Sequence, residues 1–248
     1  MSFLAALQFL TTIPLPGRRE FRPEVLGRST VFFPLIGLII GLIMGGWRWL
    51  LGLLLPQPVA NVVVIASLVL ATGALHLDGF LDTCDGLAGH KSVEERWQVM
   101  HDSRAGGFGV IGVAVLLLVK YVSLTNVPAS LLTATLVLTP VLSRWAMVYA
   151  IFIYPYARPS GLGKVFKERT SWVRFAIATA VAFVLAAIIL QMTGVVIMAA
   201  VWLMVVVVAA YLKHQFAGLT GDTYGAINEL AESLVFIVII VLARLGLA

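Results

Sequence analysis

The stretch Ala129–Tyr154, ASLLTATLVLTPVLSRWAMVYAIFIY, is apolar along almost its whole length and contains one charged residue, Arg144. At about 1.5 Å of rise per residue, about 20 apolar residues cross the hydrocarbon core of a bilayer. The stretch therefore predicts a transmembrane helix. An arginine inside such a helix is costly and normally faces a carboxylate or an anionic substrate, so we expect Arg144 to have one of these partners.

The rest of the chain has the same character. It is 60% hydrophobic and 12% charged, with a mean hydropathy of +1.01, and these values are typical of an integral membrane protein. We predict an all-α, polytopic protein that lies in a lipid bilayer as a single domain, residues 1–248. Windows of about 17–25 apolar residues predict about seven spans, the other six being Val31–Leu55, Val59–Leu77, Phe108–Val122, Phe175–Gln191, Val195–Leu212 and Leu230–Leu247.

Polar segments alternate with short turns between these spans. The segments before the first span, and after the second, fourth and sixth spans, contain most of the Lys and Arg residues, among them Arg18, Arg19 and Lys91. All Asp and Glu residues lie in or at the edge of the same segments. Because positively charged loops stay in the cytoplasm, we predict that this polar chemistry faces the cytoplasm. The net charge of +5 follows from topology, and no basic run with interleaved aromatics indicates nucleic-acid binding.

The N-terminal residues predict an amphipathic helix on the membrane interface. Phe3, Leu7 and Leu10 fall near helical spacing, and Pro14 ends the pattern. Basic residues follow this apolar run instead of preceding it, so we expect it to be retained and not cleaved as a signal peptide. Cys84 is the single cysteine, which excludes an intrachain disulfide.

The motif HLDGFLDTCDG, residues 76–86, places three aspartates close together. Asp78, Asp82 and Asp85 stand at i, i+4 and i+7, so on a helix that continues from the second span they project from one face. Like charges this close repel unless a cation lies among them, and oxygen-only ligands favour Mg²⁺ or Mn²⁺. The alternative is that the aspartates cap helices at the interface while Gly79 and Gly86 break the helix.

A second motif, HDSRAGGFG, follows at residues 101–109. Asp102 is a fourth candidate metal ligand and Arg104 a candidate phosphate contact. Gly106 and Gly107 allow the backbone to approach an anion closely at the start of the third span. The alternative is an ordinary surface ion pair between Asp102 and Arg104.

Two later motifs and two histidines complete the polar chemistry. Arg158 in YPYARPSGLG is a further phosphate contact, and Asp222 in GLTGDTYGAINELAES could bind metal or a hydroxyl, or merely cap a helix. His76 and His101 flank the aspartates, but histidines in such positions are more often simply hydrogen-bonded. Aspartates, arginines and glycines on one face favour phosphoryl transfer, in which a metal holds a diphosphate and a carboxylate accepts a proton.

These motifs together resemble one known family. HLDGFLDTCDGLAG, MHDSRAGGFGVIG, PYARPSGLG and GLTGDTYGAINELAE are similar to those of the cobalamin 5′-phosphate synthases, also called adenosylcobinamide-GDP ribazoletransferases. The opening ALQFLTTIPLP and the run VFFPLIGLIIG resemble the family too, so the similarity extends over nearly the whole chain. Two positions depart from the family pattern, Thr12 and His101, where a basic residue is common. The basic contacts of the family are not carried over to them.

The resemblance implies an Mg²⁺-dependent transferase in the cytoplasmic (inner) membrane of a bacterium. Its substrates would be adenosylcobinamide-GDP and α-ribazole or its 5′-phosphate, and its products adenosylcobalamin or its 5′-phosphate and GMP. A second copy of the chain and other corrinoid-pathway proteins are partners that the sequence leaves open. The residues assigned in this way are Asp78, Asp82, Asp85 and Asp102 for metal, Arg104, Arg144, Arg158, Gly106 and Gly107 for substrate, and Asp82, Asp85 and Asp222 for catalysis.

Two other functions compete with this interpretation. The CDP-alcohol phosphotransferases also space aspartates by helical turns around a glycine, but their signature requires Ala-Arg where this chain has Asp82 and Thr83. An ion-coupled transporter places its charges near the membrane midplane, whereas almost every carboxylate of this chain is predicted at one face. The transferase is therefore favoured over both.

Overall fold

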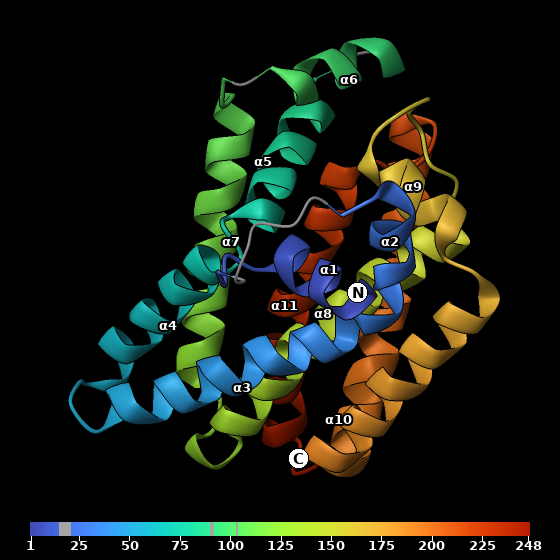
Figure 1. Ribbon diagram of the computed structural model, residues 1–248. Helices are drawn as coiled ribbons and strands as arrows, with labels where there is room; N and C mark the ends of the chain where they lie inside the picture. Colours follow the sequence, from blue (N-terminus) through green and yellow to red (C-terminus); the bar gives the residue numbers. More distant parts are fainter. Residues whose placement is uncertain (15–20, 90–91, 103) are drawn as a thin grey trace.

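The computed structural model describes residues 1–14, 21–89, 92–102 and 104–248. Arg18, Arg19 and Lys91, which the topology prediction uses, lie outside these residues. Within them the chain forms helices and no β-sheet (Figure 1), which confirms the all-α prediction. The helices are α1 (Ser2–Leu10), α2 (Pro23–Gly27), α3 (Phe33–Gly52), α4 (Gln57–Ala71), α5 (Leu75–Leu87), α6 (Val93–His101), α7 (Gly107–Asn126), α8 (Ala129–Ile153), α9 (Leu162–Arg169), α10 (Trp172–Phe216) and α11 (Gly221–Arg244).

Helix α8 is largely buried, and α3 packs along it. Gly37, Gly41 and Gly45 recur every four residues and form a smooth stripe on α3. A Cβ at Gly37 would lie 2.3 Å from the carbonyl oxygen of Pro140. At Gly41 the corresponding distance to the carbonyl oxygen of Val137 is also 2.3 Å. The stripe thus lets the two backbones approach closely, which is how apolar helices associate in lipid.

The second predicted span, Val59–Leu77, is not one continuous helix. Helix α4 ends at Ala71, α5 begins at Leu75, and the two helices are bent by 89°. Gly73 and Ala74 have positive φ angles of 61° and 57°, and this left-handed backbone ends the first helix. The prediction that the aspartate motif continues directly from this span is therefore wrong, because the motif lies on a separate short helix.

Helix α10 contains the fifth and sixth predicted spans, joined by a sharp break. The backbone of Leu190 (φ −130°, ψ 17°) and Gln191 (φ 50°, ψ −135°) is not helical. A Cβ at Gly194 would lie 2.1 Å from the carbonyl oxygen of Ala186. The absence of a side chain at Gly194 therefore lets the two arms of α10 fold back on each other (Figure 1).

The seventh predicted span, Leu230–Leu247, begins too late. Helix α11 starts at Gly221, where Thr220 and Thr223 form a reciprocal capping box. Asp222 consequently lies in the first turn of this long helix. The same helix then continues into the interior of the bundle.

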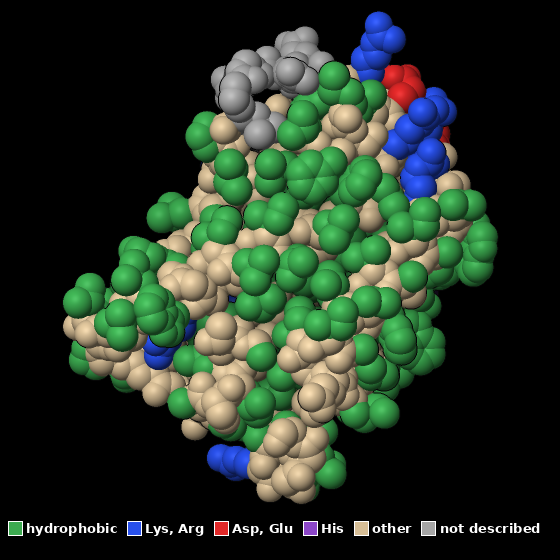
Figure 2. All heavy atoms as spheres, turned by 60° about the horizontal axis from the view of Figure 1, so that its bottom comes forward, with side chains coloured by type: hydrophobic (Ala, Val, Ile, Leu, Met, Phe, Trp, Pro, Cys, Tyr) green, Lys and Arg blue, Asp and Glu red, His purple; other side chains and the backbone are tan. Residues whose placement is uncertain are grey.

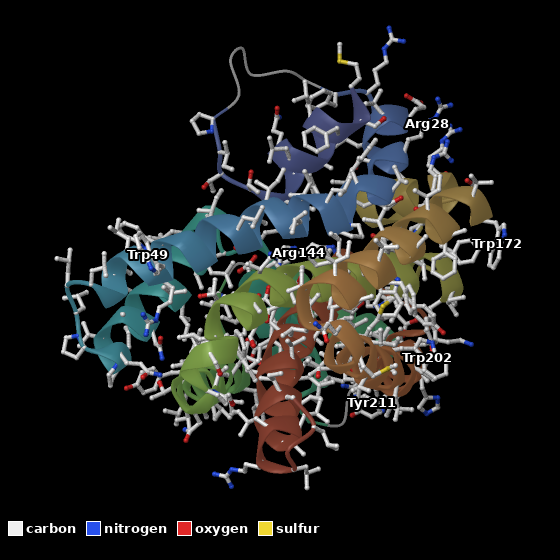
Figure 3. All side chains as sticks on the ribbon, turned by 90° about the horizontal axis from the view of Figure 1, so that it is seen from below. Arg28, Trp49, Arg144, Trp172, Trp202 and Tyr211 are labelled. Atoms are coloured by element: carbon white, nitrogen blue, oxygen red, sulfur yellow. The ribbon has the colours of Figure 1, made fainter. Side chains whose placement is uncertain are left out.

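The outer surface is apolar. In the described residues five helical stretches, Pro23–Gly52, α7, α8, α10 and α11, are long and apolar enough to cross a membrane, and the bent pair α4–α5 could be a sixth span. Apolar side chains dominate the face in Figure 2, and Lys and Arg lie at its margins. Trp49, Trp172 and Trp202 lie on the outside of the bundle, whereas Arg144 lies in its interior (Figure 3). The polytopic membrane fold is confirmed, and the number of about seven spans stays a prediction.

The polar segments gather at one end of the bundle. Helix α2 packs against α9, and α6 reaches the end of α10, where Trp97 Nε1 donates to the carbonyl oxygen of Phe216 at 3.2 Å. In Figure 1 α6 and α9 lie toward the upper end, α2 lies below α9, and the C-terminus lies at the lower end. The predicted N-terminal helix is present as α1, and it packs into the core through Ala5, Ala6 and Leu10.

Candidate active site

The three clustered aspartates lie on α5, as their spacing predicts. Gly79 and Gly86 lie inside this helix, so the alternative that they break it is wrong. Gly79 faces the first turn of α11, where a Cβ would lie 2.8 Å from the carbonyl oxygen of Asp222. The absence of a side chain at Gly79 therefore brings Asp222 close to the α5 aspartates.

Arg158 and Asp222 meet because two distant loops pair through their backbones. The amide of Ala157 donates to the carbonyl oxygen of Leu219 at 2.8 Å, and the amide of Leu219 donates to the carbonyl oxygen of Pro155 at 2.8 Å. This pairing places Arg158 Nη2 3.1 Å from Asp222 Oδ2. A predicted phosphate contact and a predicted catalytic aspartate thus lie together.

This site holds more negative than positive charge. Helix α5 alone is too short to span the membrane, and Asp82 lies near its middle. Burial raises the pKa of Asp82 to about 7, and the charges of Asp78 and Asp222 act in the same direction. Asp85 adds to this effect, whereas Arg158 opposes it. The surplus of carboxylates favours the binding of a cation.

The donor atoms suit a hard divalent cation but do not form a complete cage. In the described part of the chain, no group of three His, Cys, Asp or Glu side chains lies close enough to hold a metal ion. Mg²⁺ commonly takes one or two protein carboxylates and completes its shell with water and substrate phosphates. Asp78 and Asp82, one turn apart on α5, meet this smaller requirement, and their role in metal binding stays a prediction.

Asp85 is used to hold the start of α7. Its Oδ2 accepts a hydrogen bond from the amide of Gly106 at 2.8 Å, and its Oδ1 accepts one from the amide of Gly109 at 2.7 Å. A carboxylate is favoured at this position because amide groups and the positive end of the helix dipole meet there. In this structure Asp85 thus holds the amides at the start of α7, and Gly106 approaches Asp85 closely. The metal-binding and catalytic roles predicted for Asp85 and the substrate contact predicted for Gly106 stay predictions. A Cβ at Gly107 would meet no atom within 4 Å, and the substrate contact predicted for Gly107 stays a prediction.

Asp102 and Arg104 form the surface ion pair that the sequence left as an alternative. Arg104 Nη2 lies 2.9 Å from Asp102 Oδ2, and the two side chains are 41% and 87% exposed for Asp102 and Arg104 respectively. The hydrogen bond from Arg104 lowers the pKa of Asp102. In the described structure this pair does not join the group around Asp82, so the predicted roles in metal and phosphate binding stay predictions.

Arg144 lies inside the bundle and pairs with a carboxylate. It is fully buried, and its Nη1 donates to Glu232 on α11. Glu232 also accepts a hydrogen bond from Lys120 Nζ at 2.6 Å, and Lys120 Nζ lies 2.6 Å from Glu229 Oε2. Two positive and two negative groups therefore balance one another among α7, α8 and α11. Glu232 is the carboxylate that the burial of Arg144 requires, and the substrate-binding role predicted for Arg144 stays a prediction.

Three residues of this region, Lys120, His76 and Tyr224, have no role assigned to them from the sequence. Lys120 is a basic residue inside a predicted span, which is the signal that singled out Arg144. His76, considered only as a flanking residue, and Tyr224 are both 2% exposed and line a cavity beside Asp78. No local pattern reveals the cavity that His76 and Tyr224 line, because α5 and α11 meet only through tertiary packing.

Comparisons with known proteins cover nearly the whole chain. A family model described as cobalamin-5-phosphate synthase matches residues 2–241. A curated relative from Geotalea daltonii, named adenosylcobinamide-GDP ribazoletransferase, is 40% identical over 94% of each chain. A relative of the same name from Roseiflexus sp. is 38% identical over 92% of this chain and 84% of its own length. Another, from Thermosynechococcus vestitus, is 36% identical over 95% of this chain and 94% of its own length. No solved structure matches the chain significantly.

Proposed function

Because the chain belongs to the cobalamin-5-phosphate synthase family, we propose that it joins adenosylcobinamide-GDP to α-ribazole or α-ribazole 5′-phosphate. The products are adenosylcobalamin, or its 5′-phosphate, and GMP, which makes this the last step of nucleotide-loop assembly in vitamin B12 biosynthesis. The match over residues 2–241 carries the proposal, because it includes every residue of the candidate site. It also favours this function over a CDP-alcohol phosphotransferase or an ion-coupled transporter.

The transfer requires one bond to form and one to break. A hydroxyl oxygen of the ribazole attacks the phosphorus on the cobinamide side of the diphosphate, and the bond from that phosphorus to the oxygen of GMP breaks. A carboxylate accepts the hydroxyl proton. Asp222 suits this role because it lines the cavity next to Asp78 and is held in place by Arg158. Asp82 is the second candidate.

Arg158 can bind a phosphate oxygen while it holds Asp222. Its Nη2 is used by the aspartate, and its Nε has no hydrogen-bond partner in the described residues. The planar guanidinium can hold a carboxylate and a phosphate at once because its donors point in different directions. Arg158 would therefore orient the diphosphate toward the attacking hydroxyl.

Asp78 and Asp82 are the residues that would hold a magnesium ion. Their oxygen donors and the excess of negative charge around them support this assignment. When bound, Mg²⁺ neutralises charge on the diphosphate and stabilises the departing GMP. We place this chemistry on the cytoplasmic side of the bacterial inner membrane, because the polar segments gather at one end of the bundle.

Release of GMP tests the proposed function. Purified protein in detergent is incubated with adenosylcobinamide-GDP, α-ribazole and Mg²⁺, and GMP and cobalamin are separated by chromatography. We expect equal amounts of both products, loss of both with EDTA and recovery on return of Mg²⁺.

Three outcomes would contradict separate parts of the proposal. Folded protein that releases no GMP contradicts the assigned reaction. GMP released at the same rate without α-ribazole indicates hydrolysis in place of transfer. Full activity in EDTA contradicts only the role of the metal.

A further inference from the structure

A cavity of about 220 Å³ lies next to the aspartates at the polar end of the bundle. Phe9, Phe33 and Phe166 line it and contact one another, with ring centroids 4.9–6.1 Å apart. Met147 and Ile151 of α8 complete the apolar wall. Pockets for drug-sized ligands usually measure about 300–1,000 Å³, so this cavity suits one fused ring system and not a whole substrate.

Two buried polar side chains also line this cavity. His76 and Tyr224 are each 2% exposed, and the ring nitrogens of His76 and the hydroxyl of Tyr224 have no hydrogen-bond partner in the described residues. Burial of unpaired polar atoms is unfavourable, so we expect a ligand in this cavity to supply hydrogen-bonding partners for them. The cavity is therefore built for a mostly apolar group that carries one or two hydrogen-bonding atoms.

Asp78 and Asp222 line the same cavity. In the proposed function these carboxylates lie beside the reacting diphosphate and the attacking hydroxyl. A group in the cavity must therefore belong to a substrate that reacts at this edge of the cavity.

The parts of the two substrates differ in how well they match these walls. The corrin macrocycle is far larger than a single fused ring system. Guanine carries donors and acceptors around most of its edge, and in the proposed function the two carboxylates that could accept from it are already used by the metal and the attacking hydroxyl, which leaves only His76 and Tyr224. The base of ribazole is a benzimidazole, which is flat, has hydrocarbon edges and carries one bare ring nitrogen. It matches both the aromatic wall and the small number of polar atoms.

We propose that this cavity binds the benzimidazole base of the acceptor nucleoside, with the phenylalanine rings packed against the base and Tyr224 or His76 hydrogen-bonded to its bare nitrogen. The inference rests on the proposed function and adds the subsite that orients the acceptor. A base held here carries its ribose toward Asp78 and Asp222, so the cavity selects the acceptor and positions its hydroxyl.

Narrowing the cavity tests the subsite through the KM for each substrate. Ile151→Trp places a larger side chain in the apolar wall and fills part of the cavity. We therefore expect the KM for α-ribazole to rise about 5- to 150-fold, while the KM for adenosylcobinamide-GDP is unchanged. Ile153→Trp is the matched control, because Ile153 lies on the same helix, is 47% exposed and does not line the cavity. We expect wild-type values for both substrates in this control.

A second, milder variant keeps the test possible if Ile151→Trp does not fold. Tyr224→Phe removes only the hydroxyl, so the KM for α-ribazole should rise about 2- to 10-fold. Tyr211→Phe is its control, because Tyr211 is 52% exposed on the outer surface. Free benzimidazole should inhibit the wild-type enzyme competitively against α-ribazole and inhibit Ile151→Trp less.

The outcomes separate this inference from the proposed function. An active wild-type enzyme whose KM for α-ribazole is unchanged in both variants contradicts the subsite alone. A selective rise in the KM for adenosylcobinamide-GDP assigns the cavity to the other substrate and also overturns the inference. Folded wild-type protein without GMP release overturns the proposed function itself.

Discussion

Two groups of charged side chains meet α11, one inside the bundle and one at its polar end. The buried ion cluster consists of Lys120, Arg144, Glu229 and Glu232. The aspartate site consists of Asp78, Asp82, Asp222 and Arg158. The first has as many positive as negative groups and is almost inaccessible to solvent, whereas the second has more carboxylates than bases and borders a cavity.

This is the difference that we expect between charges that stabilise the fold and charges that bind a ligand. In the buried ion cluster each carboxylate has a basic partner, so removal of one group leaves an uncompensated charge in a medium of low dielectric constant. In the aspartate site the carboxylates repel one another, so removal of one carboxylate lowers this repulsion. Without such a substitution, only a bound cation or a basic group of a ligand would lower it. The same chemical substitution should therefore have opposite effects on stability in the two places.

Glu232→Gln should have the largest effect on stability. It leaves Lys120 and Arg144 with one carboxylate between them, and loss of one partner of a buried ion pair costs about 3–5 kcal/mol. We expect a much lower unfolding temperature in detergent, measured by differential scanning fluorimetry. Glu168→Gln is the control, because its carboxylate is exposed and lies 3.9 Å from Lys164; it should unfold like the wild type.

A second substitution tests whether charge balance is the cause. Lys120→Met added to Glu232→Gln leaves one positive and one negative group in the cluster, so part of the lost stability should return. If the double variant is less stable than the single one, packing around Lys120 matters more than balance.

Asp82→Asn should abolish activity without harming the fold. We expect the rate of GMP release to fall at least about 100-fold, as for loss of a residue that stabilises the transition state or carries its proton. The unfolding temperature should stay the same or rise, because repulsion from Asp78 and Asp222 is relieved. Retained activity would contradict the catalytic role, and a large loss of stability would mean that the two charged groups do not differ as argued.

Gly79→Ala should have a smaller effect, and it should change both the stability of the fold and the activity of the site. The new methyl group would meet the backbone of Asp222 at 2.8–3.3 Å, and backbone cannot move aside as a side chain can. We expect a loss of about 1–3 kcal/mol in the free energy of unfolding and a reduced kcat, because α11 and Asp222 shift away from α5. Gly46→Ala is the control, since a Cβ there meets no atom within 4 Å. Wild-type activity in Gly79→Ala would show that the approach of α5 to α11 does not set the geometry of the site.

The sequence predicts the fold class well because span length and apolarity are local properties. It does not predict the break between α4 and α5, since a left-handed residue such as Ala74 leaves no mark in hydropathy. It also places the start of the last helix too late, because Asp222 and the two buried glutamates lower the apolarity of a helix that their partners in the bundle stabilise. In each case tertiary contacts decide what local composition cannot.

The same limit applies to the site. The spacing of Asp78, Asp82 and Asp85 correctly predicts one helical face, but it does not show that Asp85 holds the amides that begin α7. Lys120 and Glu232 lie 112 residues apart in the chain, so no periodicity links them. The sequence therefore predicts which residue types the chemistry uses, and the packing decides which of them remain free to react.

Arg104→Ala should have the smallest effect on stability, because its ion pair with Asp102 is exposed to solvent and such pairs contribute little. We expect no measurable change in unfolding temperature, so any change in kinetics can be read as a direct effect on the substrate. If Arg104 turns from Asp102 to the diphosphate, the KM for adenosylcobinamide-GDP rises while that for α-ribazole does not. Lys164→Ala is the control, since Lys164 has a similar exposed partner on α9. Unchanged kinetics in Arg104→Ala would remove this arginine from the site and leave Arg158 as the basic residue that meets the phosphates.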